Sequence, residues 1–395
     1  HQQVPAVQLR QVGGGNGKGV AHLPLPRRAA LADLFGRVVQ PKQPAGQRVG
    51  WPQGLDQFPG LVVAAFGQPG GAQGHGQHAI GGLQGLGDVF GGGIRGKSRN
   101  DGHIVRVIIV SIACKNGKSM FRLTTINNRS AIEVDGVFHD LAKVVGDESL
   151  ADPMNAIARF SELHSASDKA RSGGSSVSGP IGVCVPNPKK VFAIGLNYRS
   201  HASESEMEVP PAPLTFTKFP SCLVGPTADV VLSGPLVDWE VEIVVVIGKG
   251  GKNIAESSSW SHVAGITLGQ DISDRMVQMT GKPPQFSLGK SFDSFGPIGP
   301  VIASVDSFSN PDDIGIWCDV AGQRMQEART TDLIFNIPFL ISYLSSICTL
   351  EPGDIIFTGT PDGVGAARGQ FLKAGDVIDS GAEVIGTLRN TCVEK

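Results

Sequence analysis

The first 119 residues contain no glutamate, no tyrosine and no methionine, although all three types occur in the rest of this 395-residue chain. The same segment holds 25 of the 53 glycines and carries 13 lysines and arginines against four aspartates. Residues 120–395 carry 21 lysines and arginines against 32 acidic residues, so a near-zero total charge hides two segments of opposite sign. We expect little packed structure in 1–119, because such a composition buries too little apolar surface to offset chain entropy.

Met120 is the first methionine, and an ordinary acidic globular composition follows it. We therefore interpret 1–119 as disordered or as translated upstream sequence. The alternative is a basic arm that binds nucleic acid or a partner, but no aromatic residues alternate with the basic ones around Arg95–Arg99, as a stacking surface requires. Gly91–Ser98 has the spacing of a phosphate-binding loop without the strand before it and the helix after it. We expect no nucleic-acid partner.

Other absences exclude further classes of protein. The six cysteines are scattered and form no C-x-x-C pair, which argues against a zinc site and against a disulfide framework. Ile104–Ala113 is apolar but too short to span a bilayer, and it includes Arg106. No signal peptide is evident. We expect a cytoplasmic protein with no membrane partner.

Residues 120–170 predict a small, β-rich N-terminal module. Asp135-Gly136 between two apolar runs, Ala131–Val134 and Val137–Leu141, indicates a hairpin, and a helix is expected over Met154–Leu163. The Ser/Gly-rich residues 171–189 predict a linker to a larger domain at 190–395, for which the family resemblance described below implies a catalytic role.

Short strands dominate the region 190–395. Asn336 and Pro338 predict the start of one amphipathic helix, which favours an α+β fold with a largely antiparallel or mixed sheet. The expected strands are Val191–Ile194, Asp238–Ile247, Gly265–Leu268, Ile314–Val320, Asp354–Thr358 and Glu383–Leu388.

Glu240 and Glu242 are the most informative residues, because they lie one residue apart at the start of the β-branched run Ile243–Ile247. Side chains alternate faces along a strand, so both carboxylates point the same way. Two carboxylates on an apolar strand repel each other, and a hard divalent cation would resolve that conflict. The alternative is an edge strand whose glutamate face is solvated.

Asp271 follows the next strand and offers a third carboxylate, which is enough for one octahedral ion with open positions. Arg275 and Gln278 are three residues apart, so on a helical turn both would face an anionic substrate. Lys290 lies among small and apolar residues that would desolvate it. Ordinary solvated surface positions are the alternative for these last three.

His201 and Glu204 have the i, i+3 spacing that places an imidazole and a carboxylate on one helix face, which suits a general base. A surface helix is the alternative. Thr360 lies in a Gly-rich turn after a strand, where its hydroxyl and backbone N–H groups would bind a substrate carboxylate. Alone, this segment would be only a turn.

Together, these motifs make the chain resemble the fumarylacetoacetate hydrolase family. Residues 120–170 are similar to a small module that many bacterial relatives carry, whereas 1–119 match nothing in the family. The matching elements occur in family order over about 190–395: Gly195–His201, Glu240-Val241-Glu242, Asp271 with Arg275 and Gln278, Gly289–Phe292, and Thr358–Gly363.

The resemblance implies a mixed β-roll or β-sandwich, usually a homodimer, with one Mg²⁺ or Mn²⁺ held by Glu240, Glu242 and Asp271. It implies that Lys290 stabilises oxyanion charge and that the His201–Glu204 pair activates water on a lid-like segment. Ser200 and Met276 stand where many relatives carry aspartate, which puts the substrate in doubt more than the metal.

The implied activity is metal-dependent hydrolysis of a carbon–carbon bond in a 2-oxo or 1,3-diketo acid of the acylpyruvate or fumarylpyruvate type, through a metal-held enolate. Oxaloacetate decarboxylation and isomerisation or hydration of a 2-hydroxydienoate stay open, because each can pass through a similar enolate. A third possibility is a non-catalytic metal-binding scaffold.

Overall fold

The computed structural model describes residues 62–66, 98–100, 103–110 and 120–395. Before Met120, strands β1 (Val62–Phe66), β2 (Ser98–Asn100) and β3 (His103–Val110) form an antiparallel sheet in the order β1-β3-β2. The rest of 1–119, including most of the Gly91–Ser98 stretch, lies outside the described residues. The interpretation of 1–119 as disordered or upstream sequence therefore stays a prediction.

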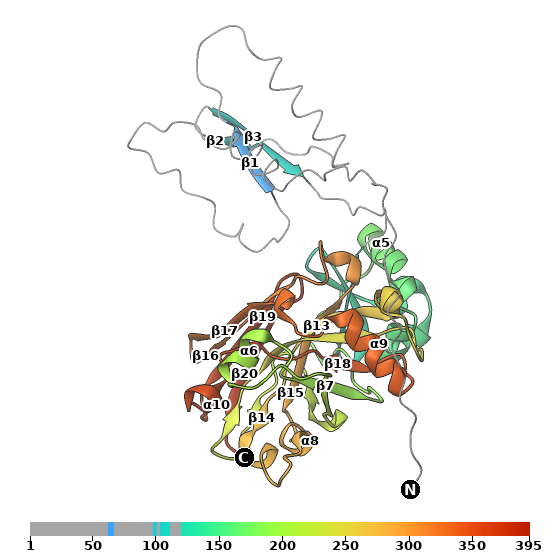
Figure 1. The fold of residues 1–395 in the computed structure, drawn as a ribbon. Helices are drawn as coiled ribbons and strands as arrows, with labels where there is room; N and C mark the ends of the chain where they lie inside the picture. The colour runs from blue at the N-terminus through green and yellow to red at the C-terminus, as the bar shows by residue number, and fades with distance from the viewer. Residues whose placement is uncertain (1–61, 67–97, 101–102, 111–119) are drawn as a thin grey trace, which may run out of the picture. The chain divides into compact units, whose positions relative to one another are not determined.

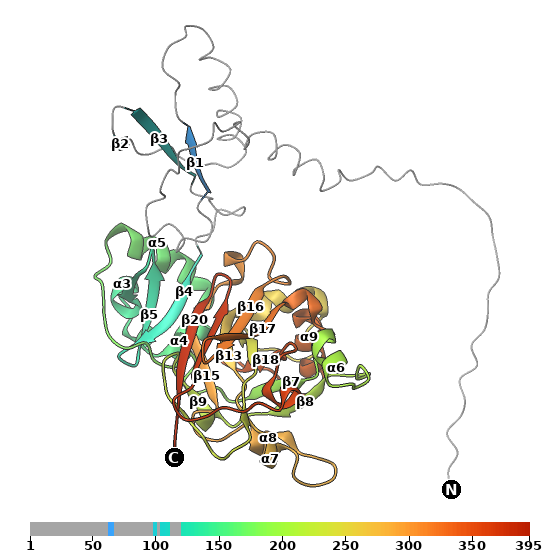
Figure 2. The same ribbon diagram turned by 90° about the vertical axis from the view of Figure 1, so that its left-hand side faces the viewer.

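A ten-stranded mixed sheet forms the centre of residues 120–395 (Figures 1 and 2). Its order is β6-β5-β4-β15-β13-β12-β18-β7-β8, and β9 pairs in parallel with β15. Most neighbours are antiparallel, but β18 and β7 are parallel. The strands are β4 (Arg122–Ile126), β5 (Arg129–Val134), β6 (Val137–Asp140), β7 (Val191–Gly195), β8 (Leu214–Thr217), β9 (Leu223–Val224), β12 (Val241–Ile247), β13 (Val263–Gln270), β15 (Gly296–Ala303) and β18 (Ile355–Phe357).

A second, five-stranded sheet has the order β10-β20-β19-β16-β17, and β11 pairs with β14 in a separate short ribbon. Mixed sheets with short helices confirm the predicted α+β class. The strands are β10 (Val230–Val231), β11 (Val237–Asp238), β14 (Ser273–Asp274), β16 (Gly315–Val320), β17 (Gln323–Arg329), β19 (Val377–Ala382) and β20 (Gly386–Val393).

The helices are short and lie at the ends and faces of the sheets. Asn336 accepts the backbone N–H of Phe339 at 2.9 Å, which begins α9 where the sequence predicts it. The helices are α3 (Leu141–Val145), α4 (Pro153–Ala158), α5 (Leu163–Gly173), α6 (Arg199–Glu204), α7 (Arg275–Gln278), α8 (Phe286–Gly289), α9 (Ile337–Ile347) and α10 (Gly365–Arg368). The 3₁₀ turns are Glu148–Ala151, Phe160–Glu162, Pro220–Cys222, Glu256–His262, Val305–Ser307 and Thr330–Asp332.

The predicted hairpin of the N-terminal module is present as β5 and β6, which pair through Val134 and Val137. Asp135 and Gly136 both have positive φ, as a two-residue turn between right-twisted strands requires. The module does not stand apart from the rest, because β4 pairs with β15 in the central sheet.

Three boundary predictions are wrong. The expected helix over Met154–Leu163 breaks after α4, and α5 continues to Gly173, three residues into the expected linker. The expected strand Asp238–Ile247 is interrupted at Trp239 and Glu240, between β11 and β12. The first half of the expected strand Glu383–Leu388 is a turn between β19 and β20, where Val384 has positive φ, and the second half, from Gly386, is the start of β20.

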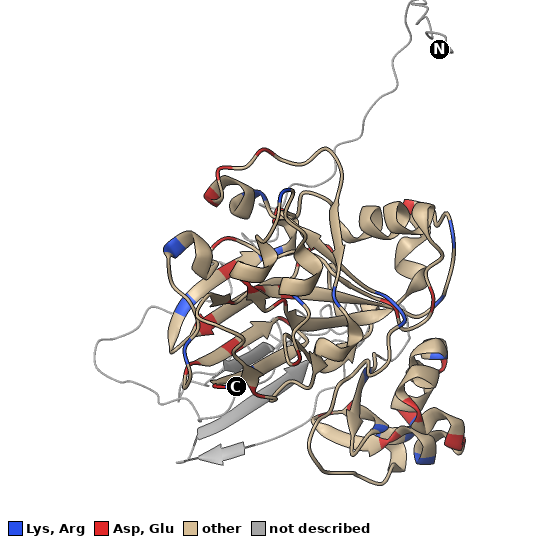
Figure 3. Cartoon of the chain, turned by 90° about the horizontal axis from the view of Figure 1, so that it is seen from below, with Lys and Arg blue, Asp and Glu red and all other residues tan. Residues whose placement is uncertain are grey.

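Every residue of β12 is buried, and this strand lies between β13 and β18 in the apolar core. Acidic and basic positions are interspersed along the described chain (Figure 3). In the part of the chain that the structure describes, no helix combines the length and apolarity needed to cross a bilayer.

Candidate active site

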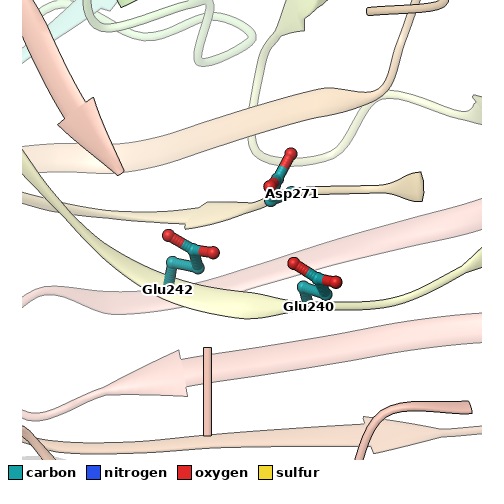
Figure 4. Close-up of side chains that lie close together, drawn as sticks. All are labelled: Glu240, Glu242 and Asp271. Atoms are coloured by element: carbon teal, nitrogen blue, oxygen red, sulfur yellow. The ribbon is translucent and has the colours of Figure 1, made fainter. Parts of the chain in front are cut away.

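Glu240, Glu242 and Asp271 lie close together where β12 begins and β13 ends, within the central sheet (Figure 4). Glu240 immediately precedes β12 and Glu242 is its second residue, so both side chains leave the same face toward Asp271. Asp271 directly follows β13, and its backbone N–H donates to the carbonyl of Glu240 at 2.8 Å. All three are buried, and each offers an oxygen within 4.8 Å of the others. The structure thus brings together the three carboxylates that the sequence grouped.

Two buried glutamines accept backbone N–H groups at the start of β12. Gln270 accepts the N–H of Glu240 at 3.0 Å, and Gln326 accepts the N–H of Val241 at 3.0 Å. The hydroxyl of Thr360 donates to the carbonyl of Val241 at 3.0 Å. The hydroxyl proton that the sequence assigned to the substrate is therefore used within the protein. Gln326 was missed because it lies 85 residues away in sequence.

Lys290 and Arg275 neutralise part of this acidic cluster. The ammonium group of Lys290 lies 2.7 Å from Oε2 of Glu240 and 2.8 Å from Oδ2 of Asp271. Nη2 of Arg275 lies 2.8 Å from Oε1 of Glu240. Burial alone would raise the pKa of Glu240, but the two cations hold it at about 2. The burial that the sequence predicted for Lys290 is present, with 2% of the residue exposed.

Lys218 is a second buried lysine that sequence reasoning missed. Its ammonium group donates to Oδ1 of Asp271 at 2.7 Å, to the carbonyl of Phe295 at 3.0 Å, and to the carbonyl of Lys290. Burial opposes the charged form, but Asp271 raises the pKa of Lys218 above its ordinary value. All three N–H donors are therefore used. The only sequence feature that could have indicated this site residue is its position as a charged residue directly after the short strand β8.

Glu242 is the carboxyl group of the cluster whose negative charge is least compensated by nearby cations. Its Oε2 accepts the N–H of Gly359 at 2.7 Å, and no described cation forms an ion pair with it. Burial, together with the charges of Asp271 and Glu240, raises the pKa of Glu242 well above its ordinary value. A divalent cation would supply the charge that this group lacks, and buried carboxylate oxygens are the ligands that Mg²⁺ and Mn²⁺ favour. The residues therefore fit such an ion.

Arg275 and Gln278 share one turn of α7, and Nη1 of Arg275 donates to Oε1 of Gln278 at 2.8 Å. The other side of the guanidinium group binds Asp238, with Nε and Nη2 at 2.8 and 2.6 Å from Oδ2. Asp238 is fully buried and also accepts the N–H groups of Gly365 and Ala366. Asp238 was the residue that sequence reasoning overlooked here. It fixes the direction of Arg275 from outside the carboxylate cluster.

His201 and Glu204 lie on α6 with 3.5 Å between Nδ1 and Oε2. This contact is not a hydrogen bond, because Nδ1 of His201 has no hydrogen-bond partner in the described chain. Both carboxylate oxygens of Glu204 instead accept the N–H of Gly363 at 3.0 Å, and the indole of Trp239 donates to the carbonyl of the same glycine at 3.1 Å. Glu204 thus ties α6 to the segment that follows Thr360.

The mixed-sheet fold and this site define an enzyme superfamily that acts on small-molecule acids. Residues 190–393 match the family described as fumarylacetoacetate (FAA) hydrolase C-terminal, and the chain belongs to that family.

Three relatives show the range of the family. The mitochondrial oxaloacetate tautomerase FAHD2B of Bos taurus is 43% identical over 213 residues, which cover 53% of this chain and 68% of the relative. The crystal structure of an HpcE-like protein of Mycobacterium smegmatis has a TM-score of 0.64 at 40% identity and covers 69% of this chain and 99% of its own. Maleylpyruvate hydrolase from Sphingobium sp. SYK-6 was solved with manganese(II) and pyruvate. It has a TM-score of 0.59 at 28% identity and covers 69% of this chain and 99% of its own.

Proposed function

We propose that this chain catalyses metal-dependent keto–enol proton transfer on a short 2-oxo acid of the oxaloacetate type. The observation that carries the proposal is the buried carboxylate cluster with Lys290 directly against it. The relatives named oxaloacetate tautomerase are 42–43% identical to this chain, whereas the neighbour named as a hydrolase that carries pyruvate is 28% identical.

Glu240, Glu242 and Asp271 would hold one Mg²⁺ or Mn²⁺ ion. When bound, such an ion supplies Lewis-acid polarisation of the 2-oxo group, which makes the neighbouring C–H more acidic. The position of the charges supports this ion, because Lys218, Lys290 and Arg275 pair with Glu240 and Asp271, whereas Glu242 has no cationic partner of its own among the described residues.

The chain's own residues supply charge and proton handling. Lys290 is the group that stabilises negative charge on a substrate oxygen, since its ammonium group faces the cluster and is desolvated. His201 removes or returns the proton at carbon, because its Nδ1 forms no hydrogen bond with the described residues. Tautomerisation moves one proton from carbon to oxygen and needs no activated water. Arg275, Gln278 and the backbone at Thr360 bind the substrate carboxylate.

Hydrolysis of an acylpyruvate is the second candidate. The observation that favours it is the His201–Glu204 pair on one face of α6, where a change of the 3.5 Å separation would form the hydrogen bond that makes His201 a stronger base for water. The homodimer and the cytoplasmic location expected from the sequence remain predictions alongside either activity.

The test uses the full-length chain, stripped of metal and resupplied with Mg²⁺ or Mn²⁺. Ultraviolet absorbance follows the enol form of oxaloacetate and the diketo form of acylpyruvates, and pyruvate formation reports decarboxylation. Glu242→Ala should lose metal and turnover, whereas Glu256→Ala, at an exposed position, should keep both. Metal-dependent acylpyruvate loss without tautomerisation would transfer the assignment to the hydrolase. Metal binding with no turnover of any of these acids would instead support the non-catalytic metal-binding scaffold.

A further inference from the structure

Tyr198 places a hydroxyl group in the protein interior without a partner for it. The residue has 0% of its surface exposed, and its Oη atom forms no hydrogen bond with the described residues. Buried tyrosines normally find a partner for the O–H group, because an unsatisfied buried polar group loses its hydration without compensation. A residue needed only to fill this space would be phenylalanine.

The same short segment carries two more atoms of this kind. Oγ of Ser200 and Nδ1 of His201 are also buried without partners, so residues 198–201 contribute three of the five such side-chain atoms in the described chain. His201 belongs to the candidate site, since Glu204 on the same helix accepts the N–H of Gly363, whose carbonyl accepts the indole N–H of Trp239, next to Glu240. Unsatisfied polar groups that gather at one place indicate a ligand that supplies the missing partners.

Neighbouring contacts place Asn197, the residue directly before Tyr198, on the Glu242 side of the site. Nδ2 of Asn197 donates to the carbonyl of Thr358 at 2.7 Å, and a Cβ added at Gly359 would lie 2.7 Å from that of Asn197. Gly359 in turn donates its N–H to Glu242 at 2.7 Å. Burial and the charge of Glu242 raise the pKa of the Tyr198 hydroxyl, so it stays protonated at neutral pH. A protonated phenol is a donor, and the missing partner is an acceptor oxygen.

We propose that Tyr198 is a ligand-contacting residue whose hydroxyl donates a hydrogen bond to an oxygen of the bound 2-oxo acid. This inference rests on the proposed function and adds a binding group to it. The segment that carries the proposed base His201 then also holds the substrate, three residues earlier in the chain. Substrate binding gives the phenol the partner that the free protein does not provide.

The first test compares Tyr198→Phe with wild type in the full-length chain, with pyruvate as the probe in the presence of Mn²⁺. The variant loses one oxygen atom and no packing volume, so it should unfold at the wild-type temperature or above and bind Mn²⁺ as tightly. Its pyruvate affinity, measured by calorimetry, should fall about 10-fold or more, as for a lost hydrogen bond to a charged oxygen. Tyr343→Phe on α9 is the matched control and should leave all three values unchanged.

A second readout does not depend on the Tyr198 substitution. The chain has two tyrosines, so Tyr343→Phe leaves Tyr198 as the sole phenol. Ultraviolet resonance Raman bands of this phenol report its hydrogen bonding, and pyruvate added with Mn²⁺ should shift them.

Two results would overturn the proposal. Wild-type pyruvate affinity in Tyr198→Phe, or phenol bands that pyruvate does not shift, would remove Tyr198 from the binding site and leave the proposed function standing. Wild-type protein that binds Mn²⁺ but not pyruvate or oxaloacetate would remove both.

Discussion

The side chain of Gln326 pairs with the backbone of Val241 on the side of β12 that β18 no longer covers. Its side-chain carbonyl accepts the N–H of Val241 at 3.0 Å, while its amide nitrogen donates to Oγ1 of Thr360 and to the carbonyl of Pro361, both at 2.9 Å. The pairing of β12 with β18 covers only Val244–Val246 and so ends before Val241. One buried amide thus holds the peptide between Glu240 and Glu242.

Gln326→Leu should loosen this part of the site. The leucine fills similar space but leaves the N–H of Val241 unsatisfied, so we expect a loss of about 1–3 kcal/mol in the free energy of unfolding. We also expect weaker Mn²⁺ binding, because the backbone that carries Glu240 and Glu242 is no longer fixed. Urea unfolding and Mn²⁺ titration measure both. Gln323→Leu, at an exposed position of the same strand, should change stability by less than about 0.5 kcal/mol. Equal effects of the two substitutions would show that Gln326 does not fix the backbone at Val241.

Lys218→Met should destabilise the metal-free protein more than the metal-loaded one. Without the ammonium group, Oδ1 of Asp271 and two carbonyls lose their donor, and breaking a buried ion pair in this way costs about 3–5 kcal/mol. A divalent cation offsets part of that loss by taking the charge of Asp271. Thermal unfolding in EDTA and in Mn²⁺ compares the two states. Lys252→Met is the exposed control, and a Lys218→Met penalty that metal leaves unchanged would contradict this account.

Glu242→Gln should stabilise the metal-free protein increasingly as pH rises. The folded pKa of Glu242 lies above its unfolded value, so its contribution to stability is full below the unfolded pKa and is lost as pH rises toward the folded pKa. Glutamine removes this titration. The difference in unfolding free energy between variant and wild type, measured in EDTA from about pH 5 to pH 8, should therefore grow with pH. A flat difference would mean that Glu242 is ionised throughout, and the variant should in every case lose Mn²⁺ affinity.

Gly363→Ala should disrupt the contact between α6 and the loop after Thr360. Gly363 has φ of +96°, and an added Cβ would lie 1.9 Å from the carbonyl oxygen of Met325. We expect a loss of more than about 1–3 kcal/mol, because steric displacement adds to backbone strain. Gly369→Ala isolates the strain, since its φ is +65° with nothing within 4 Å of the added atom. Similar unfolding temperatures for the two variants would show that the loop accommodates the methyl group.

Local patterns were enough to predict the parts of this protein that depend on neighbours in sequence. Strand alternation placed Glu240 and Glu242 on one face, and Asn336 marked the start of α9. The strand predicted over Glu383–Leu388 begins three residues too early, because the apolar residues Val384 and Ile385 resemble a strand, while the positive φ of Val384 depends on how β19 and β20 meet.

The site residues missed from sequence share one property. Lys218 reaches Asp271 across 53 positions and Gln326 reaches Val241 across 85, so no short-range spacing connects either pair. A single lysine or glutamine has no distinguishing pattern until its burial is known. The same reason left Asp238 unnoticed, because its partner Arg275 lies 37 positions further on.

Strand β4 of the N-terminal module pairs with one side of β15 in the central sheet. Leu123 and Arg122 cover Ile302 and Ala303, and Arg122 also donates to the carbonyl of Ile385 at 3.2 Å. A fragment beginning where the family match begins, at residue 190, would expose that part of β15 as an unpaired strand edge, which favours association with other chains. Residues 190–395 therefore depend on a strand from the N-terminal module, and any exchanged module has to bring a strand that pairs with the same part of β15.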